Sequence, residues 1–85
     1  MNKLIEVVSR KGAEEILHLL EDEGKYYMQI ETNVGLNSRT LVTRLRELSK
    51  IGLIERKVRD NRRVLYSITE RGRRAVEKLR EFQKI

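Results

Sequence analysis

The pattern that sets the architecture lies in residues 37–69, which read NSRTLVTRLRELSKIGLIERKVRDNRRVLYSIT. Asn37 or Ser38 can cap a helix, because either side chain accepts a hydrogen bond from a free N–H group of the first turn. Gly52 stands where a helix commonly stops. We therefore expect a helix over about residues 38–51. Its buried stripe is expected to comprise Leu41, Leu45 and Leu48.

The second half of this stretch has the pattern of a β-hairpin over about residues 53–68. Apolar and polar residues alternate over residues 53–58 and again over residues 64–68, as in strands with one buried face. Asp60 and Asn61 lie between them and favour a turn, since their side chains bond to the local backbone and tolerate positive φ. Three arginines surround that turn: Arg59, Arg62 and Arg63.

The remainder of the chain is expected to be helical, apart from a short extended segment at residues 25–27. Gly24 stands where a C-cap glycine would end the helix that begins at Ala13. Thr69 can cap the C-terminal helix. The expected helices outside the first stretch cover residues 2–9, 13 to about 23, 28–33 and 70–84. All of these elements belong to one domain over residues 1–85, because a chain of this length builds one modest core.

The composition indicates a globular domain outside a membrane. The chain is 39% hydrophobic and 38% charged, and no apolar run approaches the roughly 20 residues of a membrane span. The N-terminus has neither a long apolar segment nor a signal cleavage motif, so we expect a cytoplasmic protein. With no cysteine and a single histidine, the chain is expected to use no disulfide, metal or other cofactor.

The positive charge is concentrated in one part of the chain. Residues 1–38 hold four basic and seven acidic residues, whereas residues 39–85 hold fifteen basic and six acidic residues. The first part therefore has a net charge of −3 and the second a net charge of +9, within a total of +6. Such an asymmetry attracts a polyanion to one face, and nucleic acid is the expected partner.

Four segments resemble the winged-helix transcription regulators of the MarR and HxlR type. Residues 34–41 are similar to the turn and the first recognition-helix residues of these families, and residues 45–56 to the end of that helix and the first wing strand. The triplet Asp-Asn-Arg at residues 60–62 matches an Asp-x-Arg often found in the MarR wing, and residues 66–72 are similar to the second strand and the next helix. The resemblance implies an α+β, mostly helical fold, a winged helix-turn-helix with a two-stranded wing and a C-terminal helix. It also implies a DNA-binding regulator of transcription.

A recognition helix reads base edges in the major groove mainly through its N-terminal half. Arg39 is the expected base reader, since arginine pairs bidentately with guanine, while Arg46 and Lys50 lie later and are expected at the DNA backbone. The resemblance implies that Arg62 enters a minor groove and that Asp60 braces it across the turn. The alternative for the helix bases is an ordinary solvated face, and the alternative for the hairpin bases is a charged hairpin that protects a sheet edge from aggregation. The full expected DNA-binding set is Ser38, Arg39, Thr40, Thr43, Arg44, Arg46, Lys50, Arg59, Arg62 and Arg63.

Apolar residues near both ends of the chain favour an interface between two copies. The expected homodimer interface comprises Leu4, Ile5, Val8, Leu79, Phe82 and Ile85. The alternative is that both terminal helices pack on their own protomer. A homodimer would hold two recognition helices about 34 Å apart, one turn of DNA, and would favour a palindromic site.

The leading hypothesis is a sequence-specific regulator that binds double-stranded DNA. The alternatives are a winged-helix module that binds protein or RNA, and a nonspecific architectural DNA binder. No catalytic motif is present, so an enzyme is not expected. We expect the remaining candidate side chains to be structural: His18 at the surface or half-buried, Glu14, Glu15 and Glu21 solvated, and Tyr26, Tyr27 and Met28 in the core.

Overall fold

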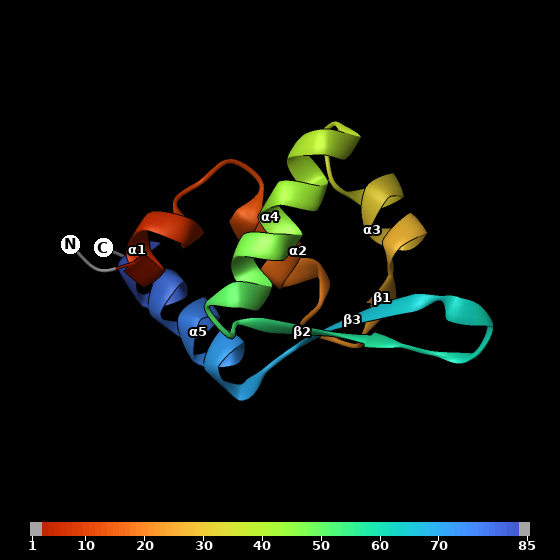
Figure 1. Cartoon of the computed structure of the whole chain (residues 1–85). Helices are drawn as coiled ribbons and strands as arrows, with labels where there is room; N and C mark the ends of the chain where they lie inside the picture. Colours follow the sequence, from red (N-terminus) through yellow and green to blue (C-terminus); the bar gives the residue numbers. More distant parts are fainter. Residues whose placement is uncertain (1–2, 84–85) are drawn as a thin grey trace.

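The computed structural model describes residues 3–83, which form five α-helices and a small antiparallel sheet (Figure 1). The helices are α1 (Lys3–Val8), α2 (Ala13–Leu19), α3 (Tyr27–Asn33), α4 (Ser38–Lys50) and α5 (Glu70–Gln83). The strands are β1 (Lys25–Tyr26), β2 (Ile54–Val58) and β3 (Val64–Ile68), with a 3-10 turn, η1 (Asp60–Arg62), between the last two. Asn2 and residue 84 of the expected terminal helices, and Ile85, lie outside the described residues. The element order is that of a winged helix-turn-helix.

Both ends of α4 are capped as its sequence predicts. The backbone N–H of Thr40 donates to the side-chain oxygen of Asn37 at 2.8 Å, which makes Asn37 the N-cap. At the other end Gly52 has φ 81°. The N–H of Leu53 donates to the carbonyl of Leu48 at 3.0 Å, and that of Gly52 to the carbonyl of Ser49 at 3.1 Å. This pair of bonds is the Schellman motif, which needs a left-handed residue and favours glycine.

The sheet has three strands in the order β1-β3-β2, so the prediction of a two-stranded wing was incomplete. The hairpin strands pair in the register Ile54↔Ile68, Arg56↔Tyr66 and Val58↔Val64. The extended segment expected at residues 25–27 supplies β1, which pairs with the other edge of β3 through Lys25↔Tyr66 and Tyr26↔Leu65. A strand of two residues is too short to show an alternating pattern, so its pairing could not be read from the sequence.

The prediction that Gly24 caps α2 was wrong, because this helix ends at Leu19. The acidic run at residues 21–23 was expected within the helix but lies after it, and acids are unfavourable at the negative end of a helix dipole. Gly24 instead lies against β3: a Cβ atom there would stand 2.9 Å from Ser67 Oγ and 3.1 Å from the carbonyl oxygen of Tyr66. The glycine therefore permits the close approach through which β1 joins the sheet.

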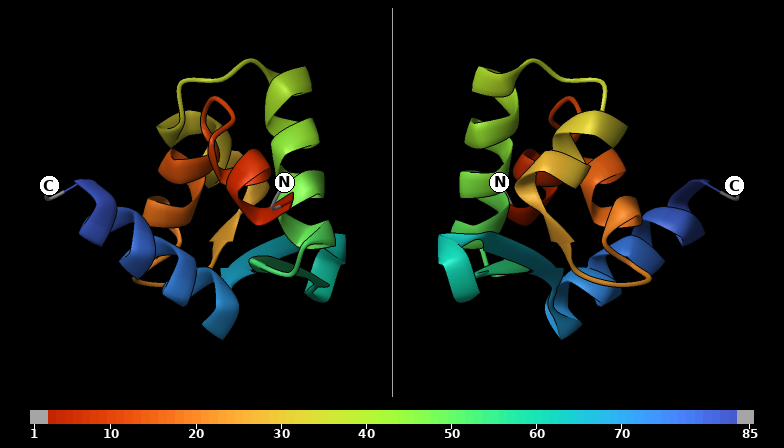
Figure 2. Two further views of the ribbon diagram at one scale, coloured as in Figure 1. Left: turned by 90° about the vertical axis from the view of Figure 1, so that its left-hand side faces the viewer. Right: turned by 90° about the vertical axis from the view of Figure 1, so that its right-hand side faces the viewer.

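The core takes buried residues from all five helices and from the hairpin, and Figure 2 shows α4 and α5 on two sides of the molecule. The three leucines predicted on one stripe of α4 are at most 2% exposed. Met28 is 66% exposed, so the prediction that it belongs to the core was wrong. Tyr26 and Tyr27 are half-buried. Met28 is the second residue of α3, after two aromatic residues. Its burial was predicted from residue type alone, which does not specify the exposed side of a short helix.

Helix α5 begins in close contact with the start of β2. Thr69 caps it as predicted, accepting a hydrogen bond from the N–H of Gly72 at 3.0 Å and donating to the carbonyl oxygen of Gly52 at 2.7 Å. A Cβ atom at Gly72 would stand 2.1 Å from the carbonyl oxygen of Leu53, so only glycine fits at this crossing. No helix in residues 3–83 has the length and apolar character to cross a membrane.

Candidate nucleic-acid interface

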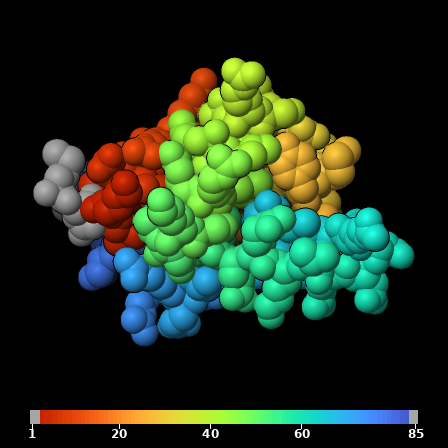
Figure 3. Space-filling view, viewed as in Figure 1, coloured from red at the N-terminus to blue at the C-terminus, as the bar shows by residue number. Residues whose placement is uncertain are grey.

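The outward face of α4 carries the exposed bases of the helix. The opposite stripe of leucines is buried, so the remaining side chains point to solvent or lie along the flanks. Figure 3 shows α4 and the β2–β3 hairpin on the same face of the molecule. The exposed residues of α4 are Ser38, Arg39, Val42, Arg46 and Lys50, and its half-buried flank residues are Thr40, Thr43, Arg44, Glu47 and Ser49.

The tip of the hairpin, which we call the wing tip (residues 59–63), is a compact turn with two left-handed residues. Asn61 has φ 64° and Arg62 has φ 62°. The N–H of Arg59 donates to the carbonyl of Arg63 at 2.7 Å and closes the turn. Within residues 3–83, however, no hydrogen bond or ion pair joins Asp60 to Arg62, so the expected brace is not present. The positive φ of Arg62 sets the direction of its side chain instead.

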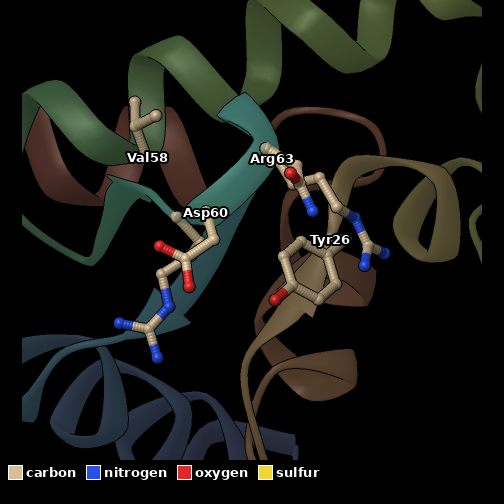
Figure 4. Close-up of a pocket in the computed structure, with 6 residues that line it drawn as sticks. Tyr26, Val58, Asp60 and Arg63 are labelled. Atoms are coloured by element: carbon tan, nitrogen blue, oxygen red, sulfur yellow. The ribbon is translucent and has the colours of Figure 1, made fainter.

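Arg63 packs against β1. Its guanidinium carbon lies 3.7 Å from the ring centroid of Tyr26, a cation–π contact that joins the wing to the third strand. Figure 4 shows both side chains at a hollow that is also lined by Val58 and Asp60. The side chain of Arg63 therefore has a partner within the protein, whereas the side chains of Arg59 and Arg62 have none among residues 3–83.

Five of the ten expected DNA-binding residues are bases that reach solvent without a protein partner. No ion pair or hydrogen bond within the described chain involves their side chains, and all five are exposed. They stand along the outward face of α4 and at the wing tip. They are Arg39, Arg46, Lys50, Arg59 and Arg62.

Arg44, by contrast, is tied to the protein. Its Nε donates to the carbonyl oxygen of Lys11 at 2.8 Å, and a second guanidinium nitrogen lies 3.0 Å from Glu47 Oε1. Glu47 also pairs with Arg10, which in turn bonds Glu6 at 3.0 Å. The Arg44 side chain is only 16% exposed. These contacts fix the flank of α4 to α1 and to the loop before α2.

Two of the expected polar contacts also make internal bonds. The Ser38 hydroxyl donates to Glu31 Oε2 at 2.8 Å, which joins the start of α4 to α3. The Thr43 hydroxyl donates to the carbonyl oxygen of Arg39 at 3.0 Å, one turn earlier in the same helix. The side chains of Thr40 and Thr43 are half-buried. The hydroxyl of Thr43 is therefore already used within α4.

Two exposed residues of this face were not among the expected DNA contacts. Val42 is 41% exposed and lies between Arg39 and Arg46 at the spacing i, i+3, i+7, a position on the helix that the sequence already indicated. Arg56 belongs to β2, is exposed, and has no polar partner among the described residues. Arg56 shares one face of the strand with the buried Ile54, so the period-two pattern gave no signal that Arg56 would be exposed. In the structure only the first residue of β2 is buried.

A second charged cluster lies between α2 and α5. His18 Nδ1 stands 3.0 Å from Glu21 Oε1 and its Nε2 stands 3.3 Å from Glu14 Oε2. Glu21 also pairs with Arg80 at 2.7 Å, and Glu14 accepts a hydrogen bond from Gln83 at 2.8 Å. The prediction that Glu14 and Glu21 are simply solvated was therefore wrong. Glu14 in α2 and Glu21 just after it both bond to side chains of α5, more than fifty residues later in the chain.

These contacts shift the pKa values of the cluster. The hydrogen bond to Glu21, with that to Glu14, raises the pKa of His18 above its ordinary value. The hydrogen bond from Gln83 is the main cause that lowers the pKa of Glu14, and the bond to His18 is the main cause for Glu21. Within residues 3–83, no group of three histidine or acidic side chains is arranged to hold a metal ion. The hydrogen bonds of the cluster connect α5 to α2 and to the turn after α2.

Five of the six expected dimer residues, all but Ile85, which lies outside the described residues, meet in a largely apolar groove between α1 and α5. Leu4, Ile5, Val8, Leu79 and Phe82 line it. Phe82 is 80% exposed and Ile5 is 60% exposed, whereas Val8 is 9% exposed and belongs to the core. Both terminal helices thus pack on their own protomer and still leave an apolar surface, which we call the α1–α5 groove.

Comparison with known proteins identifies the class to which this fold and surface belong. The model of the HxlR-like helix-turn-helix family matches residues 7–85, and the chain belongs to this family. Family and fold together indicate a DNA-binding transcription regulator of the winged-helix type, and they are not those of enzymes. The prediction of a mostly helical winged helix-turn-helix is confirmed.

Two relatives come from Methanocaldococcus jannaschii. The uncharacterized protein MJ0944 is 36% identical over 87 residues, which covers 96% of this chain and 72% of the relative. The uncharacterized HTH-type transcriptional regulator MJ0361 is 28% identical over 78 residues, covering 87% of this chain and 73% of the relative.

Solved structures share the fold. The transcriptional regulator YodB of B. subtilis is 28% identical with a TM-score of 0.83, over 94% of this chain and 81% of that chain. RosR of H. salinarum is 26% identical with a TM-score of 0.75, over 87% of this chain and 73% of that chain. A MarR-family regulator from Enterococcus faecalis is 24% identical with a TM-score of 0.88, over 95% of this chain and 76% of that chain, a likeness of fold alone.

Proposed function

We propose that this protein is a sequence-specific regulator that binds double-stranded DNA, with α4 in the major groove and the wing tip in the neighbouring minor groove. The observation that carries the proposal is the row of partnerless bases on one face. An unpaired exposed base keeps its full charge available to a phosphate or a base edge. The major groove is wide enough for an α-helix, and a narrow minor groove attracts arginine through its strong negative potential. The proposal places the protein in the cytoplasm with the DNA.

The exposed side chains of α4 suggest a division of roles. Arg39 lies in the first turn and is proposed to read guanine, because arginine binds its O6 and N7 bidentately. Val42 is proposed to contact a thymine methyl group, and the methyl group of Thr43 is available for the same purpose because its hydroxyl is bonded within the helix. Arg46 and Lys50 are proposed to bind phosphates.

The wing tip is proposed to act as an anchor. Arg62 enters the minor groove, and Arg59 binds a flanking phosphate. Arg63 is held on Tyr26 and supports the hairpin from the other side of β3. Arg44 likewise takes a structural role in this proposal, because its guanidinium holds Lys11 and Glu47.

We further propose a homodimer that covers the α1–α5 groove with a second copy. The support is the exposed Phe82 and Ile5 in a groove at the end of the molecule away from the wing (Figure 1). Apolar side chains form most of its surface, and Ser9, Arg71, Arg74 and Lys78 also line it. Exposed apolar surface of this kind favours association. Sedimentation equilibrium is expected to give a dimer for the wild type and a monomer for Phe82→Glu. A wild-type monomer at all concentrations would contradict the dimer and leave the DNA proposal standing.

Selection of binding sites from random DNA duplexes tests the function directly. The expected result is an enriched sequence, with two half-sites about one helical turn apart if the protein is a dimer. The enriched duplex should bind with a log Kd that rises linearly with log salt, with a slope of about 5 to 9 if six to ten phosphates are contacted. Binding without enrichment would indicate a nonspecific architectural protein. A salt-independent, negligible affinity for duplex DNA would favour a protein- or RNA-binding module.

A further inference from the structure

A hollow between the C-terminal half of α4 and the middle of the hairpin combines basic and apolar side chains. Three bases, Arg46, Lys50 and Arg56, line it together with the apolar side chains of Val42 and Leu45 and the ring of Tyr66. None of its lining residues is acidic. The wing-tip hollow differs in this respect, since Asp60 lines it.

The three bases of this hollow have no competing partner in the protein. No salt bridge or hydrogen bond between described residues uses their side chains. The hollow also includes Ser49, whose hydroxyl oxygen is buried without a hydrogen-bond partner in residues 3–83. Three cations around an apolar floor make a surface suited to an anionic group that also carries a nonpolar part, such as a sugar phosphate.

The position of the hollow follows from the two elements beside it. Arg56 is the middle residue of β2 and pairs with Tyr66 across the hairpin. The hollow therefore lies between α4 and the wing tip. In duplex DNA, adjoining major and minor grooves are separated by one sugar-phosphate backbone. A protein with α4 in one groove and the wing tip in the next must therefore straddle that backbone.

We propose that this hollow seats a phosphodiester of the DNA strand that separates the two grooves, with Arg56 as a phosphate-binding residue beside Arg46 and Lys50. This inference rests on the proposed function and adds a contact to it. The cations neutralise the phosphate, and the floor of Val42, Leu45 and Tyr66 accommodates the deoxyribose. A phosphate contact of this kind fixes the register of the protein on DNA and carries no sequence preference.

The experiment compares two neighbouring positions of one strand. Arg56→Gln removes a base of the hollow, and the matched control Lys57→Gln removes an exposed base that lies outside the hollow and 3.9 Å from Glu55. Salt titrations use a mixed-sequence DNA duplex and the enriched duplex, and thermal unfolding checks that both variants fold. Arg56→Gln is expected to reduce the slope of log Kd against log salt by about one. At about 0.1 M salt it should weaken binding of both duplexes roughly fivefold to tenfold, and Lys57→Gln should do so much less.

A scan of uncharged phosphates locates the contact. Methylphosphonate is placed at one position at a time in the enriched duplex, and each position is tested with the wild type and with Arg56→Gln. One position between the two grooves is expected to weaken the wild type clearly more than Arg56→Gln, because the variant has already lost one of the three cations at that phosphate and keeps only Arg46 and Lys50. Equal effects of Arg56→Gln and Lys57→Gln, or no such position in the scan, would overturn the inference while the proposed function stands. A wild type without salt-dependent DNA binding would overturn the proposed function itself.

Discussion

The face formed by α4 and the wing tip differs from α5 in the partners of its bases. Helix α5 is as rich in bases, yet Arg80 lies 2.7 Å from Glu21, Arg74 lies 3.8 Å from Glu70 and Lys78 lies 3.6 Å from Glu81. Exposed pairs of this kind add little stability, but they cancel much of the local field. On α4 and the wing tip, Arg44 and Arg63 are held within the protein, but five other bases face solvent without a partner among residues 3–83. A count of charges therefore does not distinguish the two surfaces, whereas the pairing of those charges does.

The largest expected effect concerns the placement of α5. Gly72→Ala puts a Cβ atom 2.1 Å from the Leu53 carbonyl oxygen, so α5 must move, and the free energy of unfolding should fall by about 3 kcal/mol. Urea denaturation measures this loss. The matched control is Gly35→Ala, where nothing lies within 4 Å and φ is not positive. It should change stability by less than about 1 kcal/mol. Equal losses in the two variants would contradict the proposed close packing at Gly72.

Removing a base without a protein partner should weaken DNA binding more than removing a base that is paired within the protein. Arg39→Ala is expected to weaken binding to the enriched duplex by roughly 1 to 3 kcal/mol and to relax the preference at one base pair. Arg80→Ala serves as the control, since Arg80 pairs with Glu21 between α2 and α5. Titrations against single-base variants of the duplex measure both effects. A comparable loss of DNA affinity in the control would remove the distinction between the two surfaces.

The wing tip allows affinity and stability to be separated. Arg62 has φ 62°, which costs a non-glycine residue about 1 kcal/mol, so Arg62→Gly relieves strain while removing the guanidinium. The variant should be at least as stable as the wild type, should bind all duplexes more weakly, and should lower the salt slope by about one. Thermal unfolding and salt titration give the two readings. Unchanged DNA affinity would show that Arg62 does not contact DNA.

The smallest effect is expected at the paired cluster of α2 and α5. The pKa of His18 is raised in the folded state, so its contribution to stability is complete below the ordinary value of 6.5 and is lost as pH rises through the folded pKa. The pKa values of Glu14 and Glu21 are lowered, so their contribution is present above 4.5 and is lost as pH falls through their folded pKa values.

His18→Gln tests this sign. Above the folded pKa of His18 the wild type should lose up to about 1 kcal/mol relative to its stability near pH 6, because the pairs are partly exposed. The variant should lack this alkaline loss. Urea midpoints measured on both sides of pH 6.5 compare the two proteins. An identical pH profile for both would show that the charge of His18 does not hold α5 to α2.

The elements that were predictable from the sequence are long or strongly periodic. The stripe Leu41, Leu45 and Leu48 repeats every three to four residues and defines both faces of α4. The hairpin alternates over two five-residue strands. The two-residue strand β1 has no period to detect, and the wrong end of α2 came from reading Gly24 as a cap when it serves a close approach to β3.

Local sequence therefore determined the helices, the hairpin and the concentration of bases in the second part of the chain, because propensity, capping and hydrophobic period act over a few neighbouring residues. The packing of the helices decided which of those bases pair within the protein and which face solvent without a partner. Arg44 is held by the carbonyl of Lys11, 33 positions away, and Arg80 by Glu21, 59 positions away. Local pairs such as Arg74 with Glu70 can be read from helical spacing, but partners as distant as these two meet only when the helices pack, and for this reason their pairing appears in the tertiary structure alone.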